Sequence, residues 1–165
     1  WSSDVCSSDL ELDAAVIEAA RYDTKVLIEE AIDGREIGVA VIGNDEPKAS
    51  VPGEIRQQHE YYDYEAKYNR DDTRYIVDPL LPDGASEAGR TDAVRLFEAI
   101  GARDLARVDF IIDEQGPWFL EVNTAPGFTS VSLLPMAAAA SCPAHDMTGL
   151  CRALLVEALG RGAPT

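Results

Sequence analysis

The stretch WFLEVNTAPGF, residues 118–128, decides how the rest of the chain is interpreted. Every second residue from Trp118 to Val122 is apolar, as in a half-buried β-strand, and the alternation stops at a turn rich in Pro and Gly. Side chains two apart on a strand share a face, so Glu121 and Asn123 point the same way, about 6–7 Å apart along the chain. A carboxylate and an amide at the end of a strand predict a polar partner at that place.

A second strand, ARVDFIID, precedes this stretch across the turn EQGP. If Asp113 pairs with Pro117, Asp109 lies directly opposite Glu121, with Cβ atoms about 5 Å apart. The two predicted faces carry Val108, Phe110, Ile112, Trp118, Leu120 and Val122 on one side, and Arg107, Asp109, Glu121 and Asn123 on the other. Opposed like charges are destabilising, and two carboxylates with an amide are the hard oxygen ligands that Mg²⁺ prefers. The pattern therefore favours a magnesium site over a solvated acidic face.

Composition excludes several classes of function. The chain has 165 residues, of which 46% are hydrophobic and 27% charged, which is typical of one globular domain. A net charge of -16 argues against a broad surface for nucleic acid or anionic lipid. The three cysteines show neither metal-ligand spacing nor a disulfide framework, and the sequence shows no membrane span and no signal peptide. We therefore expect a cytoplasmic protein without nucleic-acid or membrane partners.

The first ten residues, WSSDVCSSDL, differ in character from the rest of the chain. They have no helical or strand periodicity, and they resemble the in-frame translation of an adapter used in sequencing-library preparation. A natural Ser-rich linker is the alternative. We therefore treat residues 1–10 as a non-native, adapter-derived segment and leave them out of the fold prediction.

From residue 11 onward the pattern predicts an α/β (α+β) chain, with a mainly antiparallel sheet and flanking helices. A helix is expected over residues 12–21. KVLIEEAI and REIGVAVIG then predict two strands joined as a hairpin by the turn Asp33-Gly34. The polar and aromatic segment at residues 44–72 shows no sustained period and predicts a long loop.

The second half of the chain predicts one short strand, a helix, the strand pair described above and two final helices. TRYIVDP forms the short strand. In the helix SEAGRTDAVRLFEAIG, Ser86 is the expected N-cap, Val94, Phe97 and Ile100 have helical spacing, and Gly101 is the expected stop.

Three segments together closely resemble the C-terminal half of D-alanine–D-alanine ligases, which belong to the ATP-grasp superfamily: VLIEEAIDGREIGVAVIG, YYDYEAKY, and ARVDFIID with WFLEVNTAPGFTSVSLLPMAA. The likeness covers the chain from residue 11 to about residue 159. Its most specific parts are EVNTAPGFTSVSLLP and YDYEAKY, because Glu-x-Asn alone occurs across ATP-grasp enzymes. It implies the remainder of a central ATP-grasp subdomain at 11–45 and an ATP-grasp C-terminal domain at 46–165, with an active-site loop at 53–72.

The resemblance also implies an activity. Family members join two D-alanines through an acyl phosphate for peptidoglycan synthesis, with ATP and two Mg²⁺ ions, for which Mn²⁺ substitutes, as cytoplasmic homodimers. Another ATP-grasp carboxylate–amine ligase and a non-catalytic ATP-binding module are the alternatives. The family's N-terminal domain has no counterpart in the chain, so we expect a truncated ligase that is inactive by itself.

Five residues match the family's metal and oxyanion positions. Asp109, Glu121 and Asn123 match the ligands of two Mg²⁺ ions that bridge the ATP phosphates. Arg107 and the backbone N–H of Gly127 match the donors that hold the oxyanion of the tetrahedral intermediate. For Arg107, a plain salt bridge to Asp109 is an alternative that is compatible with this role.

Further residues match positions that bind ATP and substrate. Lys67 matches a phosphate-binding lysine, and Tyr68 matches the tyrosine of the loop that closes the substrate site; a solvated lysine and a core tyrosine are the alternatives. Ser132 matches the hydroxyl that holds the carboxylate of the second D-alanine, or it is only a helix N-cap. Glu36 matches the ribose-binding carboxylate, or it is an ordinary strand-edge glutamate.

The segment EEAI matches the adenine pocket. Glu29 matches the adenine contact, and Glu30 to Ile32 supply hinge backbone and an apolar wall. Many relatives carry a lysine and a large apolar residue where this chain has Glu30 and Ala31. We therefore expect a looser adenine pocket.

Overall fold

The computed structural model describes residues 9–57, 73–142 and 145–160. The chain divides into two compact units, residues 1–32 and 33–165. The first unit contains α1 (Asp9–Ala19), close to the helix predicted over residues 12–21. The second contains β1 (Arg35–Ile42), β2 (Lys48–Ala49), β3 (Gly53–Gln57), β4 (Thr73–Val77), α2 (Ala85–Ala99), β5 (Leu105–Asp113), β6 (Gly116–Asn123), α3 (Leu133–Ser141) and α4 (Met147–Gly160). The predicted domain boundary between residues 45 and 46 stays a prediction.

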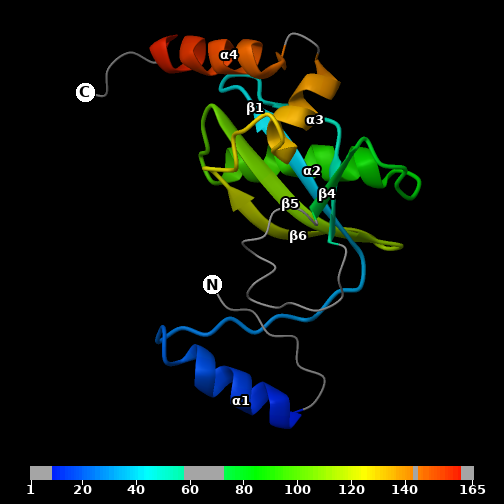
Figure 1. Cartoon of the computed structure of the whole chain (residues 1–165), viewed down its shortest axis with the longest axis vertical. Helices are drawn as coiled ribbons and strands as arrows, with labels where there is room; N and C mark the ends of the chain where they lie inside the picture. Colours follow the sequence, from blue (N-terminus) through cyan, green and yellow to red (C-terminus); the bar gives the residue numbers. More distant parts are fainter. Residues whose placement is uncertain (1–8, 58–72, 143–144, 161–165) are drawn as a thin grey trace. The chain divides into compact units, whose positions relative to one another are not determined.

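The described strands of the second unit form one antiparallel sheet (Figure 1). Its strands follow the order β4-β3-β1-β5-β6, and the short β2 pairs with the end of β1. Within the part of the chain that the structure describes, all five strand pairs are antiparallel. The predicted mixed α/β fold, with a mainly antiparallel sheet and flanking helices, is therefore confirmed.

The two faces of the sheet are covered differently. The face that carries Ile37, Val39 and Val108 packs against α2 and forms the larger core, in which Phe97 is 1% exposed. The opposite face is covered at one end by α3 and α4, through a smaller cluster of Ala40, Leu134, Ala138 and Leu150. Beside that cluster, toward the middle of β1 and β5, the same face is polar.

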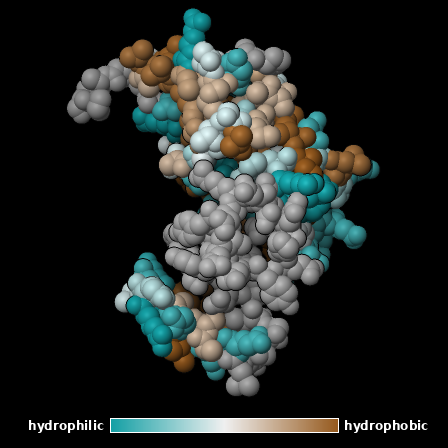
Figure 2. Space-filling view, viewed as in Figure 1, coloured by the Kyte–Doolittle hydropathy of each residue, from teal (hydrophilic) through white to brown (hydrophobic). Residues whose placement is uncertain are grey.

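The helices leave some apolar surface exposed. Figure 2 shows hydrophobic side chains over the C-terminal end of α4, where Leu155, Val156 and Leu159 are 61–79% exposed. Among the helices of the described residues, none combines the length and the apolar composition needed to cross a membrane.

The predicted hairpin around Asp33-Gly34 is wrong. In the described part of the chain, residues 25–32 form no strand, and Leu27 is 79% exposed. A strand has only two hydrogen-bonding edges, and both edges of β1 are occupied: β5 pairs along its whole length, while β2 and β3 share the other edge. The upstream segment therefore has no edge of β1 to join.

The predicted loop at residues 44–72 is also wrong in part, because it contains β2 and β3. Residues 58–72 lie outside the described residues. β3 pairs with both β1 and β4, and residues 73–77 form the expected short strand. The sequence GEIRQ carries one large apolar residue, so the alternation that usually marks a strand is missing.

The ends of α2 confirm one prediction and contradict another. Gly84, with φ 78°, occupies the N-cap position, so Ser86 lies inside the helix and the predicted serine cap is wrong. The expected stop at Gly101 is confirmed: its φ is 66°, and its N–H donates to the carbonyl of Glu98. Ile100 is 54% exposed, so the apolar stripe ends one turn earlier, at Phe97.

A β-bulge corrects the predicted faces of β6. Asp113 pairs with Gly116 and not with Pro117, and a register shift between Asp109 and Phe110 leaves Leu120 as the extra residue. As a result Trp118 pairs with Ile111, on the polar face, while the ring of Phe119 meets Phe110 edge-on at 6.4 Å. The predicted apolar row of Trp118, Leu120 and Val122 is therefore interrupted.

Candidate functional site

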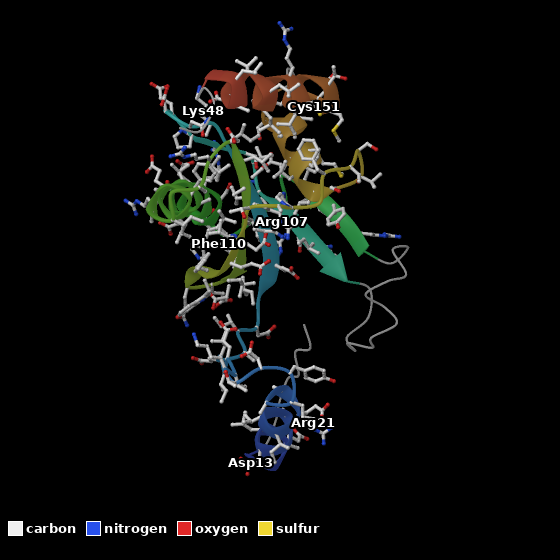
Figure 3. The ribbon with its side chains drawn as sticks, turned by 90° about the vertical axis from the view of Figure 1, so that its left-hand side faces the viewer. Asp13, Arg21, Lys48, Arg107, Phe110 and Cys151 are labelled. Atoms are coloured by element: carbon white, nitrogen blue, oxygen red, sulfur yellow. The ribbon has the colours of Figure 1, made fainter. Side chains whose placement is uncertain are left out.

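Three neighbouring strands, β1, β5 and β6, place five of the predicted site residues on one face of the sheet: Glu36, Arg107, Asp109, Glu121 and Asn123. Asp109 lies directly opposite Glu121, as predicted, and Arg107 lies opposite Asn123. On the other side of β5, Gly38 and Ala40 of β1 pair with Asp109 and Arg107, and Glu36, two residues before Gly38, shares their face. Figure 3 labels Phe110 on the α2 side of the sheet and Arg107 on the other side. The bulge lies beyond Asp109, so it leaves this part of the register intact.

Arg107 and Asp109 form a two-pronged ion pair. Nε of Arg107 donates to Oδ1 of Asp109, and Nη2 donates to Oδ2, both at 2.7 Å. The two side chains are 20% and 5% exposed. Hydrogen bonding to Asp109 raises the pKa of Arg107, against an opposing effect of burial. The salt bridge considered as an alternative for Arg107 is therefore present, and it fixes the guanidinium in one orientation.

Negative charge exceeds positive charge at this site. Burial raises the pKa of Glu36 first, the charge of Asp109 raises it further, Arg107 opposes the rise, and Glu121 adds to it. Three carboxylates thus share one guanidinium on a partly dehydrated face. A site with this excess gains from a bound cation.

The donor set fits a hard divalent cation in its chemistry. Among the described residues, no three His, Cys, Asp or Glu side chains are grouped closely enough to hold a metal ion. The predicted set differs from such a group, since it consists of two carboxylates and the amide of Asn123. Glu121 is exposed, and each Asp109 oxygen keeps a second lone pair beside its bond to Arg107. The residues are compatible with a magnesium ion that also keeps waters or phosphate oxygens.

The loop after β6 brings Gly127 and Ser132 together. A Cβ atom added at Gly127 would lie 3.1 Å from the Oγ of Ser132. That hydroxyl accepts the N–H of Thr129 at 3.1 Å and lies 2.8 Å from Oγ1 of Thr129. Ser132 occupies the N-cap position of α3, but in the described structure its side chain makes no capping hydrogen bond. The Ser132 hydroxyl therefore contacts the loop through Thr129 and does not cap the helix.

Five further predicted residues belong to other parts of the chain. Glu29 and Glu30 are exposed and Ile32 is half-buried, all within the first unit of the chain. Lys67 and Tyr68 lie outside the described residues. Their predicted roles toward adenine, phosphate and the second substrate stay predictions.

A second ionic cluster, which the sequence pattern did not predict, lies on the α2 side of the sheet. Nε and Nη2 of Arg35 donate to the two carboxylate oxygens of Glu54 at 2.9 and 2.8 Å, and Nε of Arg56 lies 3.0 Å from Oε1. The side chain of Glu54 is 4% exposed. The available signal was the two-residue spacing of Glu54 and Arg56, which places opposite charges on one face if the segment is a strand.

The second unit thus presents a polar sheet face and, after β6, a loop that contains Gly127 and Ser132. The chain as a whole is similar to several known proteins. The family model described as D-ala D-ala ligase C-terminus matches residues 3–152. The D-alanine–D-alanine ligase of Acetivibrio thermocellus is 50% identical over 128 residues, which are 76% of this chain and 34% of that protein. The corresponding ligase of Clostridium acetobutylicum is 44% identical over 133 residues, 79% of this chain and 39% of that protein.

Solved structures agree with the sequence matches. The D-alanine-D-alanine ligase from Coxiella burnetii superposes with a TM-score of 0.81 at 30% identity, covering 98% of this chain and 43% of that one. The Bacillus anthracis ligase complexed with ATP gives 0.78 at 28% identity, covering 96% and 50%. The VanG D-Ala:D-Ser ligase from Enterococcus faecalis gives 0.76 at 32% identity, covering 90% and 43%.

The chain spans between a third and two fifths of these two curated relatives. The family model, in contrast, matches most of the chain. The resemblance inferred from the sequence is confirmed: this chain belongs to the family of D-alanine–D-alanine ligase C-terminal domains.

Proposed function

We propose that this chain supplies the metal-binding and oxyanion-binding part of an ATP-dependent ligase that joins two D-alanines for peptidoglycan synthesis. In the proposed reaction, a carboxylate oxygen of the first D-alanine attacks the γ-phosphorus of ATP, giving an acyl phosphate and ADP. The amine of the second D-alanine then attacks the acyl carbon, loses a proton and expels phosphate. The observation that carries the proposal is the shared face of Arg107, Asp109, Glu121 and Asn123.

The excess of carboxylates supports a site for cationic cofactors. Asp109, Glu121 and Asn123 would hold two Mg²⁺ ions, with Mn²⁺ as a substitute, and the bound metal would neutralise phosphate charge. The raised pKa of Glu36 supports the same assignment, because burial and the neighbouring Asp109 charge disfavour its ionised form when no cation is present. Glu36 would contact the ribose of ATP.

Arg107 is suited to stabilise the oxyanion that develops during amine attack. Its guanidinium is held by Asp109 at 2.7 Å, so little reorganisation is needed when charge develops. The backbone N–H of Gly127 would be the second donor, since a glycine allows the substrate to approach closely. Ser132, near Gly127, would hold the carboxylate of the second D-alanine.

The remaining assignments complete the proposal. Lys67 would bind phosphate, Tyr68 would close the loop, and Glu29, Glu30 and Ile32 would form the adenine pocket. The whole protein would work as a cytoplasmic homodimer on ATP and D-alanine, without nucleic-acid or membrane partners.

The test is an assay of phosphate release. The assayed protein, called the complete ligase below, is this chain fused to the part that full-length family members carry in addition to it. D-Alanine should stimulate release in the presence of Mg·ATP, with D-alanyl-D-alanine as product. D-Serine and D-lactate are tested as alternative second substrates. Stimulation by another amine and not by D-alanine would indicate a different carboxylate–amine ligase.

Binding measurements separate catalysis from a pure binding module. Titration with a non-hydrolysable ATP analogue and Mg²⁺ measures binding alone. If the protein binds the ATP analogue but turns over none of the tested substrates, the ligase assignment is contradicted and the ATP-binding module is favoured.

A further inference from the structure

Two glycines lie side by side on the polar face of the sheet. Gly38 of β1 pairs with Gly53 of β3, and both are buried. Neither has a positive φ, so neither is required for an unusual backbone conformation. The absence of side chains at this pair instead leaves a space above the sheet.

The side chain of Leu133, the first residue of α3, occupies this space. A Cβ atom added at Gly53 would lie 2.2 Å from Cδ1 of Leu133 and 3.0 Å from its Cγ. A Cβ atom added at Gly38 would lie 2.8 Å from Cδ2 of Leu133. Leu133 is only 2% exposed, so it has little room to turn away from either glycine. We call Gly38 and Gly53 together the Leu133 seat.

The seat adjoins the ion pair of the candidate site. The same added Cβ atom at Gly38 would lie 3.1 Å from Oδ1 of Asp109 and 3.2 Å from Cδ of Arg107. Leu133 directly follows Ser132, whose hydroxyl holds the loop through Thr129. One buried leucine therefore joins the loop to the sheet beside the ion pair.

We propose that the Leu133 seat positions the loop of residues 127–132 for the amino acid that supplies the attacking amine. The inference rests on the proposed function, because it assigns Ser132 to the carboxylate of that second substrate. The depth of the seat sets the height of Ser132 above the sheet, and hence its distance from Arg107. Gly53 and Leu133 are positioning residues and do not touch the reacting atoms.

The test compares four forms of the complete ligase: wild type, Gly53→Ala, Leu133→Val, and the double variant. Gly53→Ala should raise the KM for the second amino acid about tenfold, because small displacements in a catalytic geometry are costly. The KM for ATP should change less than twofold. Leu133→Val empties part of the seat without a clash and should raise the same KM by a smaller factor.

The double variant provides the rescue. Val at position 133 lacks the two Cδ atoms that a methyl group at position 53 would meet, so the volume added at one residue is removed at the other. The KM for the second amino acid should fall back toward the wild-type value, below the product of the two single effects. Gly89→Ala is the matched control, since an added Cβ at Gly89 in α2 meets nothing within 4 Å.

The outcomes separate this inference from the proposed function. A wild-type protein without D-alanine-dependent turnover would contradict the proposed function. The contact between Gly53 and Leu133 would then still be tested by melting temperature: Gly53→Ala should lower it, and adding Leu133→Val should restore it. If turnover is present, an unchanged KM for the second amino acid in both single variants would overturn the inference. Equal rises in the KM for ATP and for the amino acid, without rescue, would also overturn it. Should Gly53→Ala fail to fold, the KM of Leu133→Val decides the matter.

Discussion

The two ionic clusters of the sheet differ in how far guanidinium groups compensate the charge of their carboxylates. On the α2 side, Glu54 receives two hydrogen bonds from Arg35 and a contact from Arg56, and hydrogen bonding to Arg35 lowers its pKa. On the other side, Glu36 shares Arg107 with two further carboxylates, and burial raises its pKa. One cluster has two guanidinium groups for one carboxylate. The other has one guanidinium for three.

The difference separates a cluster that stabilises the fold from the cluster for which we propose cation binding. In the Glu54 cluster, called the balanced cluster below, the guanidinium groups fully compensate the one carboxylate, so its contribution is complete when the chain folds. An unbalanced cluster is held in place by the surrounding sheet and stays less stable until a cation or a charged substrate arrives. Variants of the unbalanced cluster should therefore change turnover, and variants of the balanced cluster should change stability.

The largest effect is expected for Glu121→Gln, on the unbalanced side. Turnover of the complete ligase should fall about 100-fold or more, because the variant removes a charged metal ligand. The melting temperature should stay within about 2 °C of the wild type, since Glu121 is exposed and its loss relieves repulsion with Asp109.

Glu114→Gln is the matched control for this variant. Glu114 is exposed in the turn between β5 and β6, so its substitution removes the same charge away from the site. Its turnover should equal that of the wild type. Wild-type turnover in Glu121→Gln as well would contradict the assignment of Glu121 as a metal ligand.

The balanced cluster should respond in stability. Glu54→Gln should lower the free energy of unfolding by about 2–3 kcal/mol, because it leaves the Arg35 guanidinium without its charged partner. Arg35 is 33% exposed, so solvent compensates part of the loss. Urea denaturation measures the effect.

An exposed ion pair gives the reference for Glu54. Glu87 pairs with Arg90 on the surface of α2, with Glu87 77% exposed, and Glu87→Gln should cost less than about 0.5 kcal/mol. Equal losses in the two variants would mean that the burial of Glu54 adds nothing to its ion pair.

The sequence predicted the unbalanced side far better than the balanced one. Asp109 and Glu121 lie on strands joined by a two-residue turn, so local register alone brings them together. The predicted register contained an error at Asp113, and the bulge at Leu120 compensated for it before Asp109 was reached. Glu54 meets Arg35 only because β3 pairs with β1, a contact between distant residues that no local pattern specifies.

The same limit explains the other errors. The apolar run at residues 25–32 predicted a strand, but such a run does not tell which edges of β1 other strands will occupy. The Leu133 seat escaped prediction because glycines in a strand usually indicate a bulge or a close approach, without naming what approaches. In both cases, contacts between residues that are distant in the sequence determined the structure.

The smallest effect, and the finest test of the comparison, concerns Glu36→Gln. A carboxylate whose pKa is raised in the folded state contributes stability that is fully present below its ordinary pKa of 4.5 and is lost as pH rises through the folded value. In EDTA at pH 7, Glu36→Gln should therefore melt at a higher temperature than the wild type. Near pH 4 the two should coincide.

Glu54 must show the opposite sign in the same experiment, which makes the pair of measurements decisive. Its pKa is lowered, so its contribution is present above its ordinary value of 4.5 and is lost as pH falls through the folded value. From acid to neutral pH, the melting temperature of Glu54→Gln should therefore fall further and further below that of the wild type. The melting temperature of Glu36→Gln should instead rise further and further above it. Because both variants replace one glutamate by glutamine in the same sheet, effects on net charge largely cancel between them. Two differences of the same sign would mean that the clusters are equally balanced, and the division between a stabilising face and a binding face would fail.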